Sequence, residues 1–196
     1  MLRALAVDGG MVKVVEGDAL TRESDEQEIV LHVRSGVADG LERLIARYGA
    51  EIHAVAYSIC HDQQMAEDAT AETFATAWRR IGSLRDPTRI RAWLLRIATR
   101  QALDQLRRAR KVYPAIHQER TDANPGIEAA AVDRIDVAQA LARLPPQMRA
   151  AMTLRYVADL TVDEISAATG KSRNTIKSEL RVGLRRLRET WHGTSG

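Results

Sequence analysis

The sequence predicts an all-α protein, with two small helical domains joined by a flexible linker and a helix-turn-helix in the C-terminal domain. Of its 196 residues, 45% are hydrophobic but only 4% are aromatic, so leucine, isoleucine, valine and alanine must build the cores. Apolar residues recur every three or four positions in several segments, which is the period of a helix buried on one side. Sustained alternation of apolar and polar residues, the pattern of a half-buried strand, is rare. The length suits one or two small domains.

The first helices are predicted to follow a short N-terminal extension. Residues 1–23 show no sustained period, and we expect them to be mobile. Ser24 and Gln27 have the spacing of a capping box, which would start a short helix that ends near Gly36. Asp39 then opens a longer helix, because aspartate favours a helix N-terminus. The expected buried face of this helix comprises Leu41, Leu44, Ile45, Tyr48, Ile52, Val55 and Ile59.

A third helix is predicted from about residue 63 to residue 81. The side chains expected to point inward are Phe74, Trp78 and Ile81. Asp68 and Glu72 are four residues apart and should point outward together. Residues 82–87 read GSLRDP, and this composition predicts a loop.

The next helix, which ends near Arg110, is strongly basic. Residues 76–111 carry eleven basic side chains and two acidic ones. Its apolar side holds Leu94, Leu95, Ala98, Ala102 and Leu106. Its opposite side holds Arg89, Arg96, Arg100, Arg107 and Lys111. A row of cations on one helix face indicates contact with a polyanion.

Trp93 lies at the edge of this basic stripe. An aromatic ring beside guanidinium groups suits unpaired bases, because bases stack on the ring while the cations follow the phosphates. A tryptophan on a helix with an apolar side can equally complete the hydrophobic core. The sequence leaves both roles of Trp93 open.

Residues 112–128 contain two prolines and a glycine and have no helical period, so they are predicted to link two domains. The C-terminal domain is expected over residues 129–192. It begins with a helix from about Ala129, whose inward side chains are Ile135, Ala138, Leu141 and Leu144. Pro145 and Pro146 end this helix and start another.

The segment from Thr161 onward has the signature of a helix-turn-helix. Thr161 and Glu164 form a capping box, which starts the first helix. Gly170 allows the turn, because a positive φ strains a glycine little. Ser172 is a good N-cap for the second helix. That helix buries Ile176, Leu180, Leu184 and Leu187 and exposes Asn174, Ser178, Arg181, Val182 and Arg185.

The charge of the second helix favours nucleic acid over an ordinary surface role. Residues 171–188 carry seven basic side chains and one acid, Glu179, whereas solvated helices usually mix charges. The two basic segments have net charges of +9 and +6 in a chain of net charge +3, so the remaining residues sum to −12. Two separate basic surfaces imply two contacts with a polyanion.

Several other classes of protein are disfavoured. The single cysteine, Cys60, excludes an internal disulfide and a multi-cysteine zinc site. We see neither a stretch long enough to span a membrane nor a cleavable secretion signal. No arrangement of nucleophile and base, paired carboxylates or phosphate loop predicts an enzyme, and we expect no cofactor and no metal.

Four motifs, taken together and in this order, resemble the bacterial sigma factors of the extracytoplasmic-function (ECF, group IV, sigma-70) type. They are AEDATAETFATAW (66–78), RAWLLRIATRQALDQLRR (91–108), LPPQMRAAMTLRYV (144–157) and TVDEISAATGKSRNTIKSEL (161–180). The resemblance covers roughly residues 25–190. It implies a factor that joins core RNA polymerase and directs it to promoters.

By this resemblance, residues 24–111 form a region 2 domain that binds core polymerase and the minus-ten element, and residues 129–192 form a region 4 domain that reads the minus-thirty-five element. Asp68 and Glu72 fall in the helix that docks on the polymerase β′ subunit, and the β subunit is a further partner. The loop 82–90 falls where a flipped base is held. The resemblance also implies a cytoplasmic protein without membrane insertion and an anti-sigma factor that restrains it.

The implied DNA-binding residues form two sets. Those for the single-stranded minus-ten element are Arg85, Arg89, Trp93, Arg96, Arg100 and Arg107. Those for the minus-thirty-five element are Arg173, Asn174, Lys177, Ser178, Arg181, Val182 and Arg185.

Two other hypotheses remain. A stand-alone helix-turn-helix regulator would need a ligand pocket or a phosphoacceptor within residues 25–111, and it explains the basic stripe with Trp93 poorly. An RNA-binding or anti-termination module would account for both basic segments but not for a helix suited to the major groove. Binding to core polymerase separates the three hypotheses.

Overall fold

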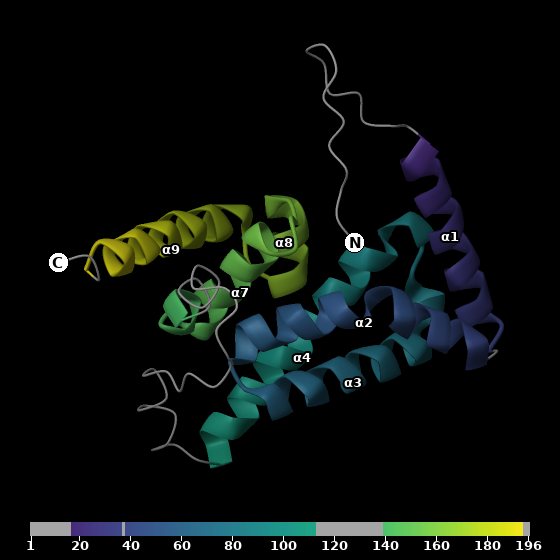
Figure 1. Ribbon diagram of the computed structural model, residues 1–196, viewed down its shortest axis with the longest axis horizontal. Coiled ribbons are helices and arrows are strands. Elements are labelled where there is room, and N and C mark those ends of the chain that lie inside the picture. The colour runs from purple at the N-terminus through teal and green to yellow at the C-terminus, as the bar shows by residue number, and fades with distance from the viewer. Residues whose placement is uncertain (1–16, 37, 113–138, 194–196) are drawn as a thin grey trace, which may run out of the picture.

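A computed structural model shows a molecule built of helices (Figure 1). The structure describes residues 17–36, 38–112 and 139–193, and every regular element in these ranges is helical, which confirms the all-α prediction. The elements are α1 (Gly17–Arg34), α2 (Ala38–Cys60), α3 (Gln63–Arg80), η1 (Ile81–Ser83), η2 (Pro87–Arg89), α4 (Ile90–Val112), α7 (Pro146–Tyr156), α8 (Val162–Thr169) and α9 (Arg173–Gly193).

The N-terminal unit, α1 to α4, is a helical bundle in which α2, α3 and α4 pack against one another. Asp62 starts α3 by accepting a hydrogen bond from the backbone N–H of Met65 at 3.0 Å. The predicted buried face of α2 is confirmed except at Ile45, whose exposed fraction is 43%. By the helical period Ile45 shares a side with the buried Ile52, so its exposure does not follow from its position around the helix.

Helix α1 begins at Gly17, seven residues before the predicted start at Ser24. The intervening residues, DALTRE, contain no glycine or proline, so helix propensity does not oppose the earlier start. The capping-box pattern at Ser24 is therefore inside a helix. Residues 1–16 of the predicted extension lie outside the described residues.

Helix α1 packs on α2 through a close backbone approach. A Cβ on Gly40 would lie 2.5 Å from the backbone carbon of His32, so only glycine fits there. The buried carboxylate of Glu26 accepts a hydrogen bond from the Tyr48 hydroxyl at 3.0 Å. Burial, together with the Glu26 charge, raises the pKa of Tyr48 well above its usual range, which keeps the phenol protonated as a donor.

The C-terminal unit, residues 139–193, contains α7, α8 and α9. The predicted capping box is formed: Thr161 Oγ1 accepts from the Glu164 backbone N–H at 3.3 Å, and Glu164 accepts from the Thr161 backbone N–H at 2.8 Å. Gly170 has φ of 74° at the turn. Ser172 Oγ accepts from the Thr175 backbone N–H at 3.1 Å, as an N-cap should.

Gly183 weakens the interior of α9 by its own propensity, but it lies where α9 packs closely on the side chain of Met152. A Cβ at this position would lie 2.7 Å from Sδ of Met152, a side chain that is itself buried in α7. The glycine thus lets α9 lie close to α7.

The linker predicted over residues 112–128 is described only at Val112, which is the last residue of α4 rather than a linker residue. Residues 113–138, including the first part of the helix expected from Ala129, lie outside the described residues. At its far end, residues 139–142 are helical, and Leu141 and Leu144 are buried as predicted.

Candidate nucleic-acid interface

The exposed face of α4 forms the first basic surface. Arg89, Arg96, Arg100 and Arg107 are exposed, while Leu94, Leu95 and Ala98 on the opposite side are fully buried, as the helical period predicted. Arg107 contacts the carboxylate of Asp104 one turn earlier, so part of its charge is compensated.

The loop before α4 is held in place by its own side chains. Asp86 caps η2 by accepting hydrogen bonds from Thr88, at 2.7 Å from the hydroxyl and 3.1 Å from the backbone N–H. These bonds, with help from Arg89 at 3.4 Å, lower the pKa of Asp86 from its ordinary value. Leu84 is buried, and its carbonyl accepts a hydrogen bond from Arg34. The loop therefore presents Arg85 and Arg89 from an ordered backbone.

The position of Trp93 is compatible with both of the roles left open by the sequence. It is half-buried and packs against the hydrophobic core. Its remaining surface lines a cavity of about 290 Å³, together with the loop residues Ser83 to Asp86 and the arginines Arg89 and Arg96. An aromatic wall with guanidinium groups beside it has the chemistry of a site for an unpaired base.

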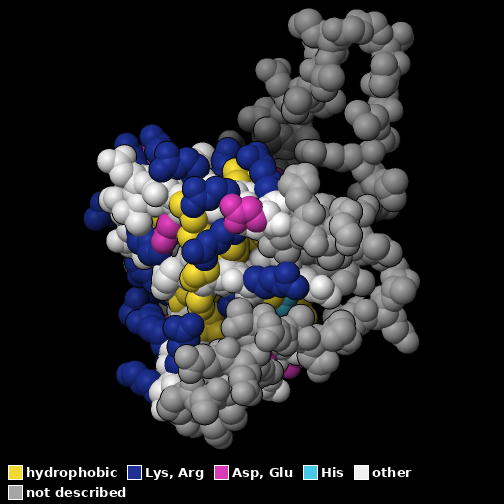
Figure 2. Space-filling model, turned by 90° about the vertical axis from the view of Figure 1, so that its left-hand side faces the viewer, with side chains coloured by type: hydrophobic (Ala, Val, Ile, Leu, Met, Phe, Trp, Pro, Cys, Tyr) yellow, Lys and Arg dark blue, Asp and Glu magenta, His cyan; other side chains and the backbone are white. Residues whose placement is uncertain are grey.

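The second basic surface is the outer face of α9. Its buried side is anchored by Ile176 and Leu180. The predicted residues Arg173, Asn174, Lys177, Ser178, Arg181 and Arg185 are all exposed, and Val182 is half-buried. Figure 2 shows the side of the molecule on which α9 lies. Lys and Arg side chains gather over the upper and left-hand parts of this view, with few acids among them.

Ion pairs adjust the charge of this surface. Lys171 Nζ lies 2.5 Å from Glu179 Oε1, and both side chains are about four-fifths buried, so this pair fixes the turn to α9 instead of facing outward. The only acid in the basic segment is thereby neutralised. The remaining six cations of the segment are exposed, although Arg173 pairs with Asp163 and Arg185 lies 3.8 Å from Glu189.

The acidic pair on α3 is exposed, as predicted. Asp68 accepts a hydrogen bond from Gln64 at 3.2 Å, and Glu72 pairs with Arg79 at 2.7 Å. The opposite side of α3 is buried through Ala66, Ala69, Thr73, Phe74 and Ala77. The pair forms a small acidic surface on the exposed side of α3, beside Arg79.

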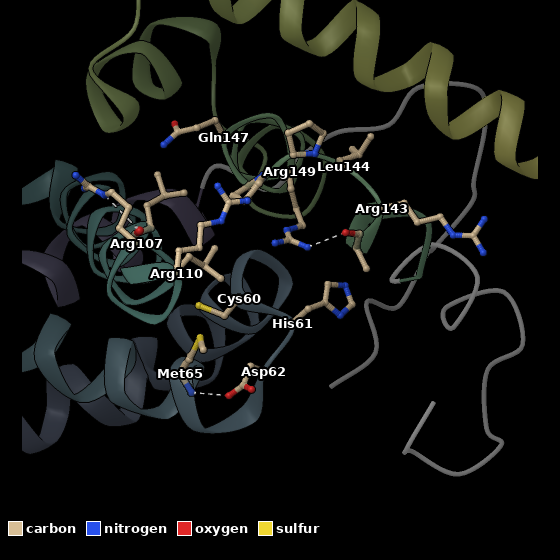
Figure 3. A pocket seen from close by; sticks show the side chains of 15 residues that line it. Cys60, His61, Asp62, Met65, Arg107, Arg110, Arg143, Leu144, Gln147 and Arg149 are labelled. Carbon is tan, nitrogen blue, oxygen red and sulfur yellow. Dashed lines mark hydrogen bonds between the residues drawn. The ribbon is translucent and has the colours of Figure 1, made fainter. Parts of the chain in front are cut away.

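A larger cavity, of about 490 Å³, lies between the end of α2, the C-terminal half of α4 and the start of α7 (Figure 3). Arg149 points into it, is 6% exposed, and donates a hydrogen bond to the Ala142 carbonyl at 2.9 Å. Burial lowers the pKa of Arg149 and raises the pKa of the Cys60 thiol to about 12. Such a thiol is unreactive, so Cys60 is a structural core residue.

One partly buried ion pair, between Arg91 and Glu51, was not predicted from the sequence. Arg91 is one of the eleven basic residues of segment 76–111, but it lies on the side of α4 that holds Leu94, Leu95 and Ala98. Its guanidinium pairs with Glu51 of α2 and donates to the Ala158 carbonyl at 2.8 Å. The helical period of α4 places Arg91 on the buried side, so the position of its side chain could have been predicted from the sequence.

In the part of the chain that the structure describes, no group of three His, Cys, Asp or Glu side chains could hold a metal ion. The helices described include none that is long and apolar enough to cross a membrane.

Comparison with known proteins agrees with this geometry. Residues 44–112 match the family Sigma-70 region 2, and residues 134–187 match Sigma-70, region 4. The ECF RNA polymerase sigma factor SigE of Mycolicibacterium smegmatis is 30% identical over 76% of this chain, which spans 60% of that protein. The ECF RNA polymerase sigma factor SigL of Mycobacterium tuberculosis is 31% identical over 76% of this chain and 88% of its own length.

Among solved structures, the sigma factor RpoE of Bartonella quintana, in complex with the anti-sigma factor NepR, has a TM-score of 0.66 and 24% identity. The match covers 77% of this chain and 96% of that one, and it shows a shared fold. The two family matches, in this order along the chain, and the identity to SigL show that the chain belongs to the extracytoplasmic-function RNA polymerase sigma factors.

Proposed function

We propose that this protein binds core RNA polymerase and directs it to promoters, where it recognises and opens the minus-ten element and reads the minus-thirty-five element as duplex DNA. The observation that carries the proposal is the pair of exposed basic surfaces on two helical units: the face of α4 beside the Trp93 cavity, and the face of α9 in a helix-turn-helix. One suits an unpaired strand and the other suits a major groove.

The N-terminal unit would act on the minus-ten element. Flipping a base out of the stack costs a few kcal/mol, so an open duplex needs a site that binds the flipped base. The Trp93 cavity provides an aromatic wall for it, and the ordered loop provides Arg85 and Arg89 for the neighbouring phosphates. Arg96, Arg100 and Arg107 continue the path of the strand along α4.

The C-terminal unit would read the minus-thirty-five element. The N-terminal half of α9 would enter the major groove with Asn174, Lys177, Ser178 and Arg181 toward the bases. Arg173 and Arg185 flank this set and suit phosphate contacts, which position the helix without selecting a sequence.

Core polymerase would allow the two weak DNA-binding surfaces to bind one promoter together. When both surfaces engage one DNA molecule, the second contact is intramolecular, and affinity rises without new interactions. Asp68 and Glu72 on α3 are the proposed docking residues for the β′ subunit, and the β subunit is a further contact. The catalytic chemistry of transcription would belong to the polymerase, so the protein acts as a non-enzymatic initiation factor in the cytoplasm.

We also propose an anti-sigma factor as a regulatory partner. The support is that RpoE, whose fold this chain shares, was solved with the anti-sigma factor NepR. For the extents of the two parts, we propose a region 2 domain over residues 24–111 and a region 4 domain over residues 129–192.

Binding to core polymerase tests the proposal. The purified protein should co-elute with core polymerase in gel filtration as a stoichiometric complex. As a control, Arg181→Ala should co-elute equally well, since α9 is assigned to DNA. A protein that binds duplex DNA tightly by itself and forms no complex with polymerase would instead be a stand-alone regulator.

A further inference from the structure

The cavity of about 490 Å³ between α2, α4 and the start of α7 carries an excess of positive charge. Among the described residues that line it are one acid, Asp62, and four arginines, Arg107, Arg110, Arg143 and Arg149. Asp62 caps α3, and the contact of Arg107 with Asp104 compensates one of the four positive charges. The cavity therefore has the electrostatic character of an anion site.

Arg149 is a buried cation with unused hydrogen-bonding capacity. It is 6% exposed, and its Nη1 donates to the Ala142 carbonyl at 2.9 Å. Its Nε is also buried but has no hydrogen-bond partner among the described residues. Figure 3 shows this side chain pointing into the cavity. A buried donor on a charged group is costly to leave unpartnered, and a bound anion would accept its hydrogen bond.

Arg110 brings a second guanidinium to the same space. Its side chain extends from α4 toward Arg149 across the cavity (Figure 3). Burial lowers the pKa of Arg149, and the positive charge of Arg110 lowers it further. Both groups remain cationic at neutral pH, because arginine does not lose its proton in proteins. The two cations repel each other, and an anion held between them would remove this repulsion.

The N-terminus of α7 lies at the same cavity, because Pro145, Pro146 and Gln147 line it. Pro145 is the N-cap of this eleven-residue helix and supplies no side-chain hydrogen bond to it. The first backbone N–H groups of a helix and its dipole favour an anion nearby. Helix α7 thus adds to the positive potential that the arginines produce.

The rest of the cavity wall is largely apolar. Met65 of α3, Leu103 and Leu106 of α4, and Leu144 line it, and the three leucines are buried. A volume of about 490 Å³ is in the range of sites that hold small organic molecules. A ligand that fits this wall has a charged end for the arginines and a carbon body for the leucines.

We propose that this cavity binds a small organic phosphate, with its phosphoryl group between Arg110, Arg149 and the N-terminus of α7 and its organic body against Leu103 and Leu106. A phosphate ester of this kind carries about two negative charges and three strong acceptor oxygens. Two guanidinium groups and a helix N-terminus match that charge better than they match a single carboxylate. Of the lining residues, only Arg107 is also among those proposed to bind DNA.

Calorimetric titration of the full chain with phenyl phosphate tests the proposal. Phenyl phosphate combines a doubly charged group with a small apolar body, and it should bind saturably at one site. Inorganic phosphate lacks the apolar body, and phenol lacks the charge. Each of these two should bind at least about tenfold more weakly than phenyl phosphate.

Substitutions locate the site. Arg110→Ala and Arg149→Met remove the two facing charges, and each should weaken phenyl phosphate binding at least about tenfold. Arg108→Ala is the matched control, because Arg108 is exposed two residues away on the same helix and does not line the cavity. Its affinity should stay within about twofold of the wild type. Circular dichroism checks the fold, and Arg110→Ala decides the matter if Arg149→Met does not fold, since Arg110 is exposed.

A second pair of variants keeps the size of the side chain and adds a carboxylate. Gln147→Glu places the negative charge at the cavity wall and should weaken phenyl phosphate binding. Gln27→Glu makes the same change at an exposed position of α1 and should bind like the wild type.

No saturable binding of phenyl phosphate to the wild type would overturn the proposal. Unchanged binding by Arg110→Ala would do the same, and so would an equal loss for Arg108→Ala, which would indicate the general basic surface of α4. Phenol that binds as tightly as phenyl phosphate would show an apolar site that does not select anions. The complex with core polymerase is measured separately, so the proposed function would stand in each of these cases.

Discussion

The double substitution Asp68→Lys with Glu72→Lys is expected to abolish assembly with core polymerase without unfolding the protein. Both acids are exposed on α3, and the core side of that helix does not include them. Like charges brought together at a complementary interface cost several kcal/mol, which corresponds to at least about a 100-fold loss of affinity. A fluorescence titration of labelled protein with core polymerase measures the loss.

A charge-matched control separates docking from net charge. Glu28→Lys with Glu42→Lys reverses two exposed acids on α1 and α2, and this variant should bind polymerase like the wild type. Circular dichroism and thermal melts should show that both double variants are folded. If the folded Asp68→Lys, Glu72→Lys variant bound polymerase normally, α3 would not be part of the interface.

The second large effect is expected from Arg181→Ala, which should relax base preference at one or two adjacent positions of the minus-thirty-five element. Arg181 is exposed about two turns into α9, where side chains reach base edges. Arginine reads guanine O6 and N7 in a bidentate contact worth about 1–3 kcal/mol of discrimination. Selection from a template library randomised upstream, performed with mutant and wild-type holoenzyme, measures the preference.

Arg188→Ala is the control for this prediction, because Arg188 is exposed nearer the end of the same helix. Its loss should weaken binding at every sequence alike, as expected for a phosphate contact. Unchanged base preference for Arg181→Ala would mean that α9 recognises DNA by shape or backbone and that its docking orientation is different.

Local rules predicted the helix-turn-helix correctly. The capping box at Thr161, the positive φ of Gly170 and the N-cap at Ser172 depend on residues within four positions of one another, so the sequence contains all the information. The buried stripe of α4 was predictable for the same reason. The exposure of the predicted DNA-binding arginines and of Lys177 followed from these periodicities, whereas Trp93 and Val182 are half-buried.

Long-range pairing could not be predicted. Glu51 and Arg91 are 40 positions apart, and Arg91 and Ala158 are 67 apart, so no periodicity connects them. The packing of α8 on α4 depends on how two separate helical units meet, which is decided by shape rather than by local pattern. The close approach of Gly183 to Met152 likewise becomes visible only in the folded structure.

Mapping of transcription start sites tests the central claim most directly, that two DNA-reading surfaces serve one initiation factor. Fragmented genomic DNA from the source organism would be transcribed by purified core polymerase with and without the protein, and RNA 5′ ends would be sequenced. We expect new start sites that need the protein, each preceded by two shared sequence elements at a constant spacing. Start sites unchanged by the protein, or new sites preceded by only one shared element, would contradict the claim.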